Sequence, residues 1–201
     1  MKFIGITGGI GAGKSVVLDY LDTKDRVFTL RSDAFAAEME APGTPCYRKI
    51  RETFPEESLY NSDGSMNRRA FSAAVFADPA ALDRLNAIVH PAVREGILAD
   101  VADKRAGGET DFYFLEAALL LEGGYDRICD EIWYVTADPA VRRERLKESR
   151  GYSDDRIDAV FASQLSDAAF REKADVVIEN NGDIAAVHAA IDRILLGERL
   201  N

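Results

Sequence analysis

The sequence predicts an α/β fold in which a parallel five-stranded sheet is flanked by helices. Three observations support this prediction. Short apolar runs alternate with helical patterns, the first run leads through a glycine-rich loop into a helical stretch, and no repeat or linker divides the chain. With 201 residues, of which 47% are hydrophobic and 30% charged, the chain has the size and composition of one compact domain with room for an insertion.

Each predicted strand is an apolar or β-branched run that is followed within a few residues by a helical pattern. This alternation favours parallel strands whose connecting helices cover both faces of the sheet. The predicted strands are Lys2 to Thr7, Arg26 to Leu30, Asp111 to Leu115, Glu131 to Val135 and Asp175 to Ile178.

A helical subdomain is predicted between the second and third strands. No strand pattern occurs there, and the ranges 71–76 and 82–89 show helical spacing. The last helix, from about Ile184 to Leu196, has one apolar face and is expected to pack on the sheet. Further helix starts are predicted at Ser32-Asp33, Asp138-Pro139 and Ser153.

The charge of the chain excludes some partners. A net charge of −10 and a pI of about 4.8 provide no long-range attraction for nucleic acid or anionic lipid, so a phosphate site must be built locally. Cys46 and Cys129 lie far apart, which favours free thiols over a disulfide or a zinc site. No apolar run is long enough for a signal peptide or a membrane span, so a cytoplasmic protein is expected. The sequence does not indicate an oligomeric state.

Residues 8–15 match the nucleotide-binding pattern G-x-x-x-x-G-K-S/T between a predicted strand and a predicted helix. Glycines let the backbone wrap closely, so that N–H groups and the positive end of the helix dipole face phosphate oxygens. Lys14 would reach the β- and γ-phosphates, and the Ser15 hydroxyl would bind the Mg²⁺ that accompanies ATP. The alternative is a glycine-rich turn that happens to precede Lys-Ser. The predicted ATP-binding residues are Gly8, Gly9, Ile10, Gly11, Ala12, Gly13, Lys14, Ser15 and Val16.

The loop predicts that the protein binds a nucleotide, but a kinase, a GTPase and a motor ATPase would all contain it. Two acidic residues that follow predicted strands help to distinguish these classes. Asp33 comes just after the second strand, at the sheet edge that carries the loop, where it could accept the proton of an attacking hydroxyl. Its alternative role, shared with Ser32, is to cap a helix. Glu116, after the third strand, could hold a magnesium-bound water.

A run of cations stands out in this acidic chain. Guanidinium groups of the run could close over the transferring phosphoryl group and spread its developing charge. The alternative is a solvated helix face, because Glu144 and Glu148 are interleaved. The run comprises Arg142, Arg143, Arg145, Lys147 and Arg150.

With these residues in view, the sequence resembles the dephospho-coenzyme A kinase family over most of its length. The glycine loop alone is shared by many unrelated proteins, but its combination with the later segments in this order is specific. The matching segments are GITGGIGAGKS, Ser32-Asp33-Ala34, Ala41-Pro42-Gly43, SDGSMNRRAFSAAVFADP, LNAIVHP, LLLEGGYD, the arginine run with Gln164 beyond it, and ADVVIENNG.

The resemblance implies a P-loop kinase-type domain over residues 1–201, with a helical acceptor-binding insertion at about 56–105 and a lid at about 142–165. It implies transfer of phosphate from ATP to the 3′-hydroxyl of dephospho-coenzyme A. Asp33 matches the family's proposed base or acceptor anchor. The resemblance also implies acceptor-binding positions at Thr7, Arg68 and His90.

Some alternatives stay open. His90 precedes Pro91, where a helix is expected to end or bend, so it could instead hydrogen-bond a freed carbonyl. The spacing between Arg145 and Arg150 is one residue longer than is common in the family, so either could be the lid arginine that meets the phosphates.

Two rival functions predict different features. A kinase of the same fold that acts on a nucleoside or shikimate would have a different helical insertion. A regulatory module that senses ATP without transferring phosphate would not need Lys14, Ser15 and Asp33 together, and all three are present.

Overall fold

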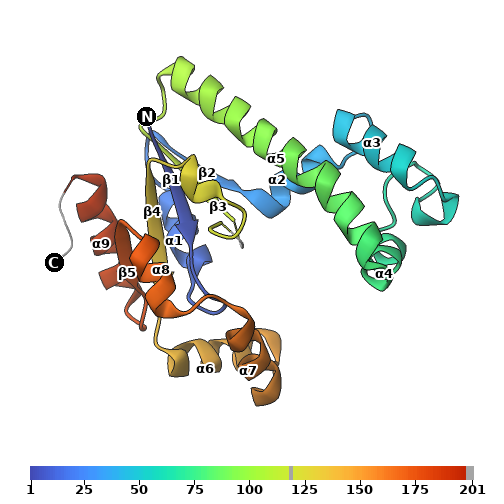
Figure 1. Ribbon diagram of the computed structural model, residues 1–201. Coiled ribbons are helices and arrows are strands. Elements are labelled where there is room, and N and C mark those ends of the chain that lie inside the picture. Colours follow the sequence, from blue (N-terminus) through green and yellow to red (C-terminus); the bar gives the residue numbers. More distant parts are fainter. Residues whose placement is uncertain (118–119, 198–201) are drawn as a thin grey trace. The chain divides into compact units, whose positions relative to one another are not determined.

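The structure, a computed structural model, describes residues 1–117 and 120–197, and it contains a five-stranded parallel sheet with the strand order β2-β3-β1-β4-β5 (Figure 1). The predicted fold class and all five predicted strands are confirmed, with strand ends that differ by at most one residue. The strands are β1 (Lys2–Thr7), β2 (Val27–Arg31), β3 (Phe112–Glu116), β4 (Glu131–Thr136) and β5 (Val176–Glu179).

Residues of the central strands alternate between the two faces of the sheet. On one face, Ile4 and Trp133 join a buried cluster with α1 (Lys14–Leu21) and α9 (Ile184–Leu195). On the other face, Ile132 packs with Leu120, and the added methyl group of any residue larger than Gly5 would meet both of these side chains. Because both faces are covered, the strands are apolar on both sides, as expected for parallel strands.

The described chain divides into two compact units. The sheet unit comprises residues 1–30 and 107–201, and the helical unit comprises residues 31–106. Besides α1 and α9, the sheet unit contains η2 (Tyr125–Arg127), α6 (Pro139–Arg150), α7 (Asp154–Ser163) and α8 (Asp167–Lys173). The helical unit contains α2 (Ser32–Met39), α3 (Pro45–Thr53), η1 (Glu57–Leu59), α4 (Arg68–Ala77) and α5 (Pro79–Gly107), whose last residue belongs to the sheet unit.

The helical unit has its own core of edge-on aromatic rings. Phe71 of α4 lies with its ring centroid 5.3 Å from that of Phe54 and 6.4 Å from that of Tyr60. The guanidinium of Arg51 lies 4.4 Å from the centroid of the Tyr60 ring. Among the described helices of the whole chain, none combines the length and the apolar character needed to cross a membrane.

All three predicted helix starts are confirmed, but the predicted cap at Ser32-Asp33 is wrong. Asp138 precedes Pro139 at the start of α6, and the Ser153 side chain accepts a hydrogen bond from the Arg156 N–H at the start of α7. Ser32, however, is already the first residue of α2, because β2 runs into this helix without a loop. Arg31 is the N-cap residue and makes no side-chain capping hydrogen bond, so Ser32 and Asp33 do not cap the helix.

The helix that contains His90 does not end at Pro91. α5 continues through Pro91, although proline has no N–H to donate within the helix. Val89, Val93 and Ile97 are buried on both sides of it at a spacing of four residues, and this packing compensates for the lost hydrogen bond. His90 itself is exposed.

The packing of α9 on the sheet predicts that substitutions at two positions of this helix will lower the stability of the protein by different amounts. Ile191 is fully buried in the core cluster, whereas Ile184 of the same helix is 50% exposed. We expect Ile191→Ala to lower the free energy of unfolding by about 2–5 kcal/mol, because it leaves a cavity. The matched variant Ile184→Ala should cost less than about 1 kcal/mol. Urea unfolding of both variants measures the difference, and equal losses would contradict the packing described.

Candidate functional site

The loop between β1 and α1 surrounds the N-terminus of that helix. Gly13 is the N-cap residue, its conformation is left-handed, and no side chain caps the helix. The first turn of α1 contains no acidic residue. The N–H groups and the positive dipole end of the helix are therefore available to an anion.

Two glycines of the loop are required by close contacts. A Cβ atom on Gly8 would lie 2.3 Å from the carbonyl oxygen of Val135 in β4. A Cβ atom on Gly13, whose φ is +89°, would lie 2.2 Å from the Nδ2 atom of Asn180. The loop is thus packed between β4 and the residue that follows β5, and only glycine fits at these positions.

Lys14 lies across the loop. Its Nζ atom donates a hydrogen bond to the carbonyl oxygen of Gly8 at 2.8 Å, and it lies 4.0 Å from the Oε1 atom of Glu116. The Lys14 and Glu116 side chains are only 18% and 17% exposed. Ser15, the next residue, is exposed in the first turn of α1. The structure therefore brings Lys14, Ser15 and Glu116 to one end of the loop.

Arg142 of α6 and Gln164, just after α7, hold the outer part of the loop. The Nε atom of Arg142 donates to the carbonyl oxygen of Ile10 at 2.8 Å. The Oε1 atom of Gln164 accepts from both the Ile10 N–H at 3.1 Å and the Nη2 atom of Arg142 at 3.0 Å. Burial lowers the pKa of the Arg142 guanidinium, which also lies 4.3 Å from the centroid of the Phe161 ring.

Arg145 and Asn180 hold the inner part of the loop. The Nη1 atom of Arg145 lies 3.4 and 3.5 Å from the carbonyl oxygens of Gly11 and Ala12. Asn180 is 1% exposed, and its Nδ2 atom donates to the Ala12 carbonyl oxygen at 3.0 Å. The Oδ1 atom of Asn180 accepts from the Nη2 atom of Arg145 at 3.3 Å.

The cations of α6 divide into two groups with different partners. Arg143 pairs with Asp154 and Asp158 of α7, and Lys147 also pairs with Asp154. By contrast, Arg142 and Arg145 form no ion pair with a carboxylate of the described residues; their partners are carbonyl oxygens and amides. Asp167 acts on Arg142 without forming an ion pair, so both guanidinium groups remain available to an anion beside the loop.

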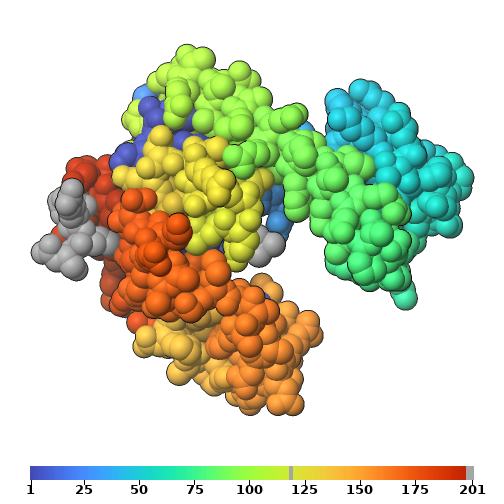
Figure 2. All heavy atoms as spheres, in the orientation of Figure 1, coloured from blue at the N-terminus to red at the C-terminus, as the bar shows by residue number. Residues whose placement is uncertain are grey.

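The other predicted lid arginine lies elsewhere. Arg150 ends α6, is exposed, and lies 6.0 Å from the centroid of the Tyr152 ring. Nothing in the described residues connects it to the loop. In the space-filling view, the residues of α6 and α7 stand out from the sheet unit as one lobe (Figure 2).

The remaining predicted site residues fall into both units. Thr7 ends β1, just before the loop, and is 1% exposed. In the helical unit, Asp33 is the second residue of α2 and is exposed. Arg68 begins α4 and His90 lies within α5; both are exposed, and the His90 side chain makes no hydrogen bond among the described residues.

The helical unit contains a hollow of about 300 Å³ beside Arg68. Most of its wall is apolar, with one cation and one carboxyl group at its edge. Burial raises the pKa of the Glu40 carboxyl, and the nearby Arg68 opposes this shift. The lining residues are Glu40, Met66, Arg68, Phe71, Ser72, Val75, Phe76, Leu82, Leu85 and Asn86.

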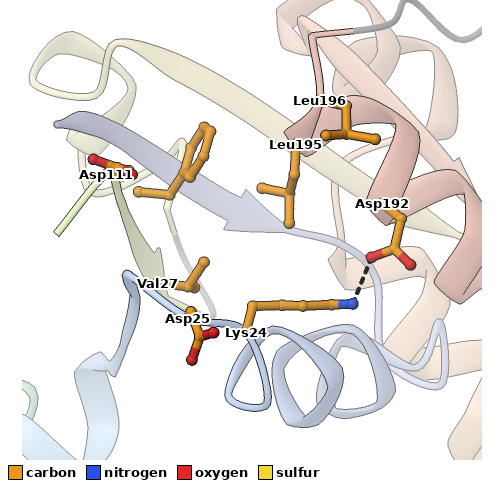
Figure 3. Close-up of a pocket in the computed structure, with 8 residues that line it drawn as sticks. Lys24, Asp25, Val27, Asp111, Asp192, Leu195 and Leu196 are labelled. Atoms are coloured by element: carbon orange, nitrogen blue, oxygen red, sulfur yellow. Dashed lines mark ion pairs between the residues drawn. The ribbon is translucent and has the colours of Figure 1, made fainter.

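A second hollow, of about 360 Å³, lies in the sheet unit at the opposite edge of the sheet from the loop. It is lined by Val27 and Phe112, at the starts of β2 and β3, and by the C-terminal end of α9 (Figure 3). Lys24 and Asp192 form an ion pair of 2.6 Å in its wall. Parallel sheets of this kind bind ligands at the carboxyl edge of their strands, so this hollow is not the candidate site.

Three residues of the site were not predicted from the sequence. Arg142 was one member of a cation run, and Gln164 and Asn180 belonged to segments that carried a resemblance without a role. All three contact the loop from positions more than 130 residues away along the chain. One signal could have pointed to Asn180, because it is a polar residue directly after the last strand. In a parallel sheet such a position lies at the edge that carries the loop.

Known proteins are similar to this chain in sequence and in fold. The family model described as dephospho-CoA kinase matches residues 2–186. A dephospho-CoA kinase of Anaeromyxobacter dehalogenans is 38% identical over 195 residues, which cover 97% of this chain and 91% of that protein. One of Corynebacterium efficiens is 35% identical over 195 residues, covering 97% and 96%. The solved structure of a Campylobacter jejuni dephospho-CoA kinase superposes with a TM-score of 0.74 at 21% identity, covering 98% of this chain and 99% of that one, which shows a common fold.

The close contact at Gly13 predicts that a substitution there will weaken nucleotide binding, whereas the same substitution at an uncrowded glycine will not. We expect Gly13→Ala to weaken Mg·ATP binding at least about tenfold, because the new methyl group displaces Asn180 and distorts the loop. Gly197→Ala is the matched control: φ is +85° there, and no described atom lies within 4 Å of the added Cβ. Both variants carry a backbone strain of about 1–2 kcal/mol, but only the first should lose affinity in calorimetry. Equal affinity of the two variants would contradict this account of the loop.

Proposed function

The chain belongs to the dephospho-CoA kinase family, and from this premise we propose that it transfers the γ-phosphate of ATP to the 3′-hydroxyl of dephospho-coenzyme A. The products are coenzyme A and ADP, and the reaction is the last step of coenzyme A biosynthesis. The observation that carries the proposal is the convergence of Lys14, Arg142 and Arg145 on an uncapped helix N-terminus in a chain of net charge −10.

The donor site is supported by the geometry of the loop. Polyphosphate oxygens would accept hydrogen bonds from the N–H groups around the start of α1, where the helix dipole is positive. Lys14 is already held over the loop by the carbonyl oxygen of Gly8 and would exchange this partner for phosphate oxygens. Its half-buried position limits competition from water.

The residues around the loop fit a magnesium ion that accompanies ATP. The exposed hydroxyl of Ser15 and the carboxylate of Glu116 are oxygen donors of the type that Mg²⁺ prefers. A magnesium ion of this kind takes most of its ligands from phosphate and water. When bound, Mg²⁺ would neutralise part of the charge on the phosphates. We propose that Ser15 binds the ion directly and that Glu116 holds one of its waters.

Arg145 is the better candidate of the two lid arginines for stabilising the transferring phosphoryl group. Its guanidinium lies against the loop and has no carboxylate partner among the described residues, whereas Arg150 is exposed beside Tyr152. A guanidinium without a competing anion stabilises developing negative charge most strongly. We therefore assign the lid, at about 142–165, a role in covering the donor phosphates through Arg145 and Arg142.

The acceptor is assigned to the helical unit. Its hollow combines an apolar wall with Arg68, which suits an organic arm that carries an anionic group, as dephospho-coenzyme A does. Asp33 is proposed as the base that accepts the proton of the 3′-hydroxyl, because it is exposed and lies two residues after the end of β2. His90 is exposed and would contact the acceptor, whereas the buried Thr7 would act by supporting the loop.

Measured turnover across a panel of acceptors tests the function. We expect rapid ADP release in the presence of dephospho-coenzyme A and none with nucleosides or shikimate. Lys14→Ala should lower turnover at least about a hundredfold, because the charge on the β- and γ-phosphates loses its partner. Lys173→Ala, an exposed lysine of α8, is the matched control and should keep full activity. Faster release with another acceptor would support a different kinase, and Mg·ATP binding without release would support a regulatory module.

The role of Asp33 leads to a separate prediction. Asp33→Asn keeps the shape of the side chain but removes its ability to accept a proton, so turnover should fall at least about a hundredfold while the fold is retained. Asp103→Asn, at an exposed position of α5, should leave turnover unchanged. Steady-state kinetics and thermal unfolding of both variants make the comparison. Near-normal turnover of Asp33→Asn would reject its role as the base.

A further inference from the structure

We infer that Asn180 is a positioning residue that connects the nucleotide loop to Arg145. Its side chain makes one hydrogen bond to the loop and one to Arg145, and we call this pair of hydrogen bonds the Asn180 lock. The inference rests on the proposed function and adds to it a residue that would not touch ATP or the acceptor. Asn180 follows β5 directly, and its side chain lies between the loop and α6.

The position of Asn180 is fixed from the sheet side. Its backbone N–H donates to the carbonyl oxygen of Thr136 at 2.8 Å, which ties the end of β5 to the end of β4. Its side chain is buried, with the residue only 1% exposed. A buried amide must satisfy both of its ends within the protein, so the orientation of Asn180 follows from its two partners.

Those two partners have opposite hydrogen-bonding character. The Nδ2 atom faces the carbonyl oxygen of Ala12, which only accepts, and the Oδ1 atom faces the guanidinium of Arg145, which only donates. If the side-chain amide were rotated by 180°, the Oδ1 atom would face the carbonyl oxygen of Ala12 and the Nδ2 atom would face the guanidinium of Arg145. Neither contact could form a hydrogen bond. Only one orientation of Asn180 therefore satisfies both the loop and the lid arginine.

The lock determines the direction of a loop amide. Asn180 and Arg145 both lie on the carbonyl side of the peptide between Ala12 and Gly13. In a trans peptide the C=O and N–H bonds point in opposite directions, and the described chain contains no cis peptide. Holding the Ala12 carbonyl therefore aims the Gly13 N–H away from Asn180 at the start of α1, where a phosphate would bind.

The contact with Gly13 makes the lock rigid. The Nδ2 atom of Asn180 occupies the space where a Cβ atom on Gly13 would lie, at 2.2 Å. The loop thus rests on the amide of Asn180 without a gap, and the loop and Arg145 share one support. Movement of either partner changes the hydrogen bonds of the other.

Two variants test the lock through the affinity for Mg·ATP. Asn180→Ala removes both hydrogen bonds and should weaken binding about tenfold. Asn180→Asp keeps the shape, but its ionised carboxylate has no donor for the Ala12 carbonyl. When protonated, the same group donates to Ala12 and accepts from Arg145, as the native amide does. Arg145 is the charged side chain that contacts this position among the described residues.

The pH dependence of Asn180→Asp separates positioning from packing. The affinity of this variant, divided by that of the unaltered protein at each pH, should rise as the pH is lowered from about 6 to about 4, because an aspartate carboxyl, whose ordinary pKa is about 3.9, becomes protonated towards the end of this range. A packing role would make the ratio independent of pH. Asn61→Ala, at an exposed asparagine of the helical unit, is the control and should bind Mg·ATP normally.

A double-mutant cycle tests the link to Arg145. If Asn180 acts through the shared lock, Asn180→Ala should weaken Mg·ATP binding less in the Arg145→Ala background than in the unaltered protein. Additive losses, or affinity of both Asn180 variants within about twofold of the unaltered protein, would overturn the inference. Because every readout is ATP binding, the test stands even if dephospho-coenzyme A proves not to be the acceptor; that failure would appear only in turnover. Thermal unfolding of each variant confirms that folded protein is compared.

Discussion

The structure depends on one constraint: the backbone between β1 and α1 lies very close to neighbouring residues. This close packing fixes the conformation of the loop, and with it the directions in which its N–H groups point. Val135 of β4 approaches Gly8 from one side, and Asn180 approaches Gly13 from another. A side chain at either glycine would force the loop outward and turn its N–H groups away from the helix axis. The sheet therefore acts as the support that aims an anion site, and the stability of its core matters for binding as well as for folding.

The same carbonyl-holding arrangement occurs twice along the loop. Arg142 holds the carbonyl of Ile10, and Arg145 with Asn180 holds that of Ala12. In each case the opposite end of the peptide, the N–H of the following residue, is turned to the other side. Neutral side chains and guanidinium groups suit this task, since carboxylates would repel carbonyl oxygens and neutralise the charge that phosphate needs.

The fold and the centre of the site were predictable, but the supports of the loop were not. Strands and the loop are local patterns: apolar runs define β1 to β5, and residues 8–15 match a motif whose chemistry is understood. The contacts of Arg142 and Asn180 join distant parts of the chain, so no local pattern contains them. The capping prediction at Ser32 failed because β2 continues directly into α2. α5 passes through Pro91 because tertiary packing outweighs one lost hydrogen bond.

The cations of α6 have two kinds of partner within the described part of the chain. Arg143 and Lys147 join α6 to α7 through carboxylates, so these charges cancel and stabilise the lobe itself. Arg142 and Arg145 form no ion pair with a carboxylate of the described residues. Burial lowers the pKa of the Arg142 guanidinium, and the nearby Tyr134 and Asp167 oppose this shift. A polyphosphate bound beside the loop would favour the charged form of Arg142 further. At physiological ionic strength the screening length is about 8 Å, so these nearby groups outweigh the distant acidic surface of the protein. The fold thus places two guanidinium groups at the loop through carbonyl oxygens and amides, and both can still pair with an anion.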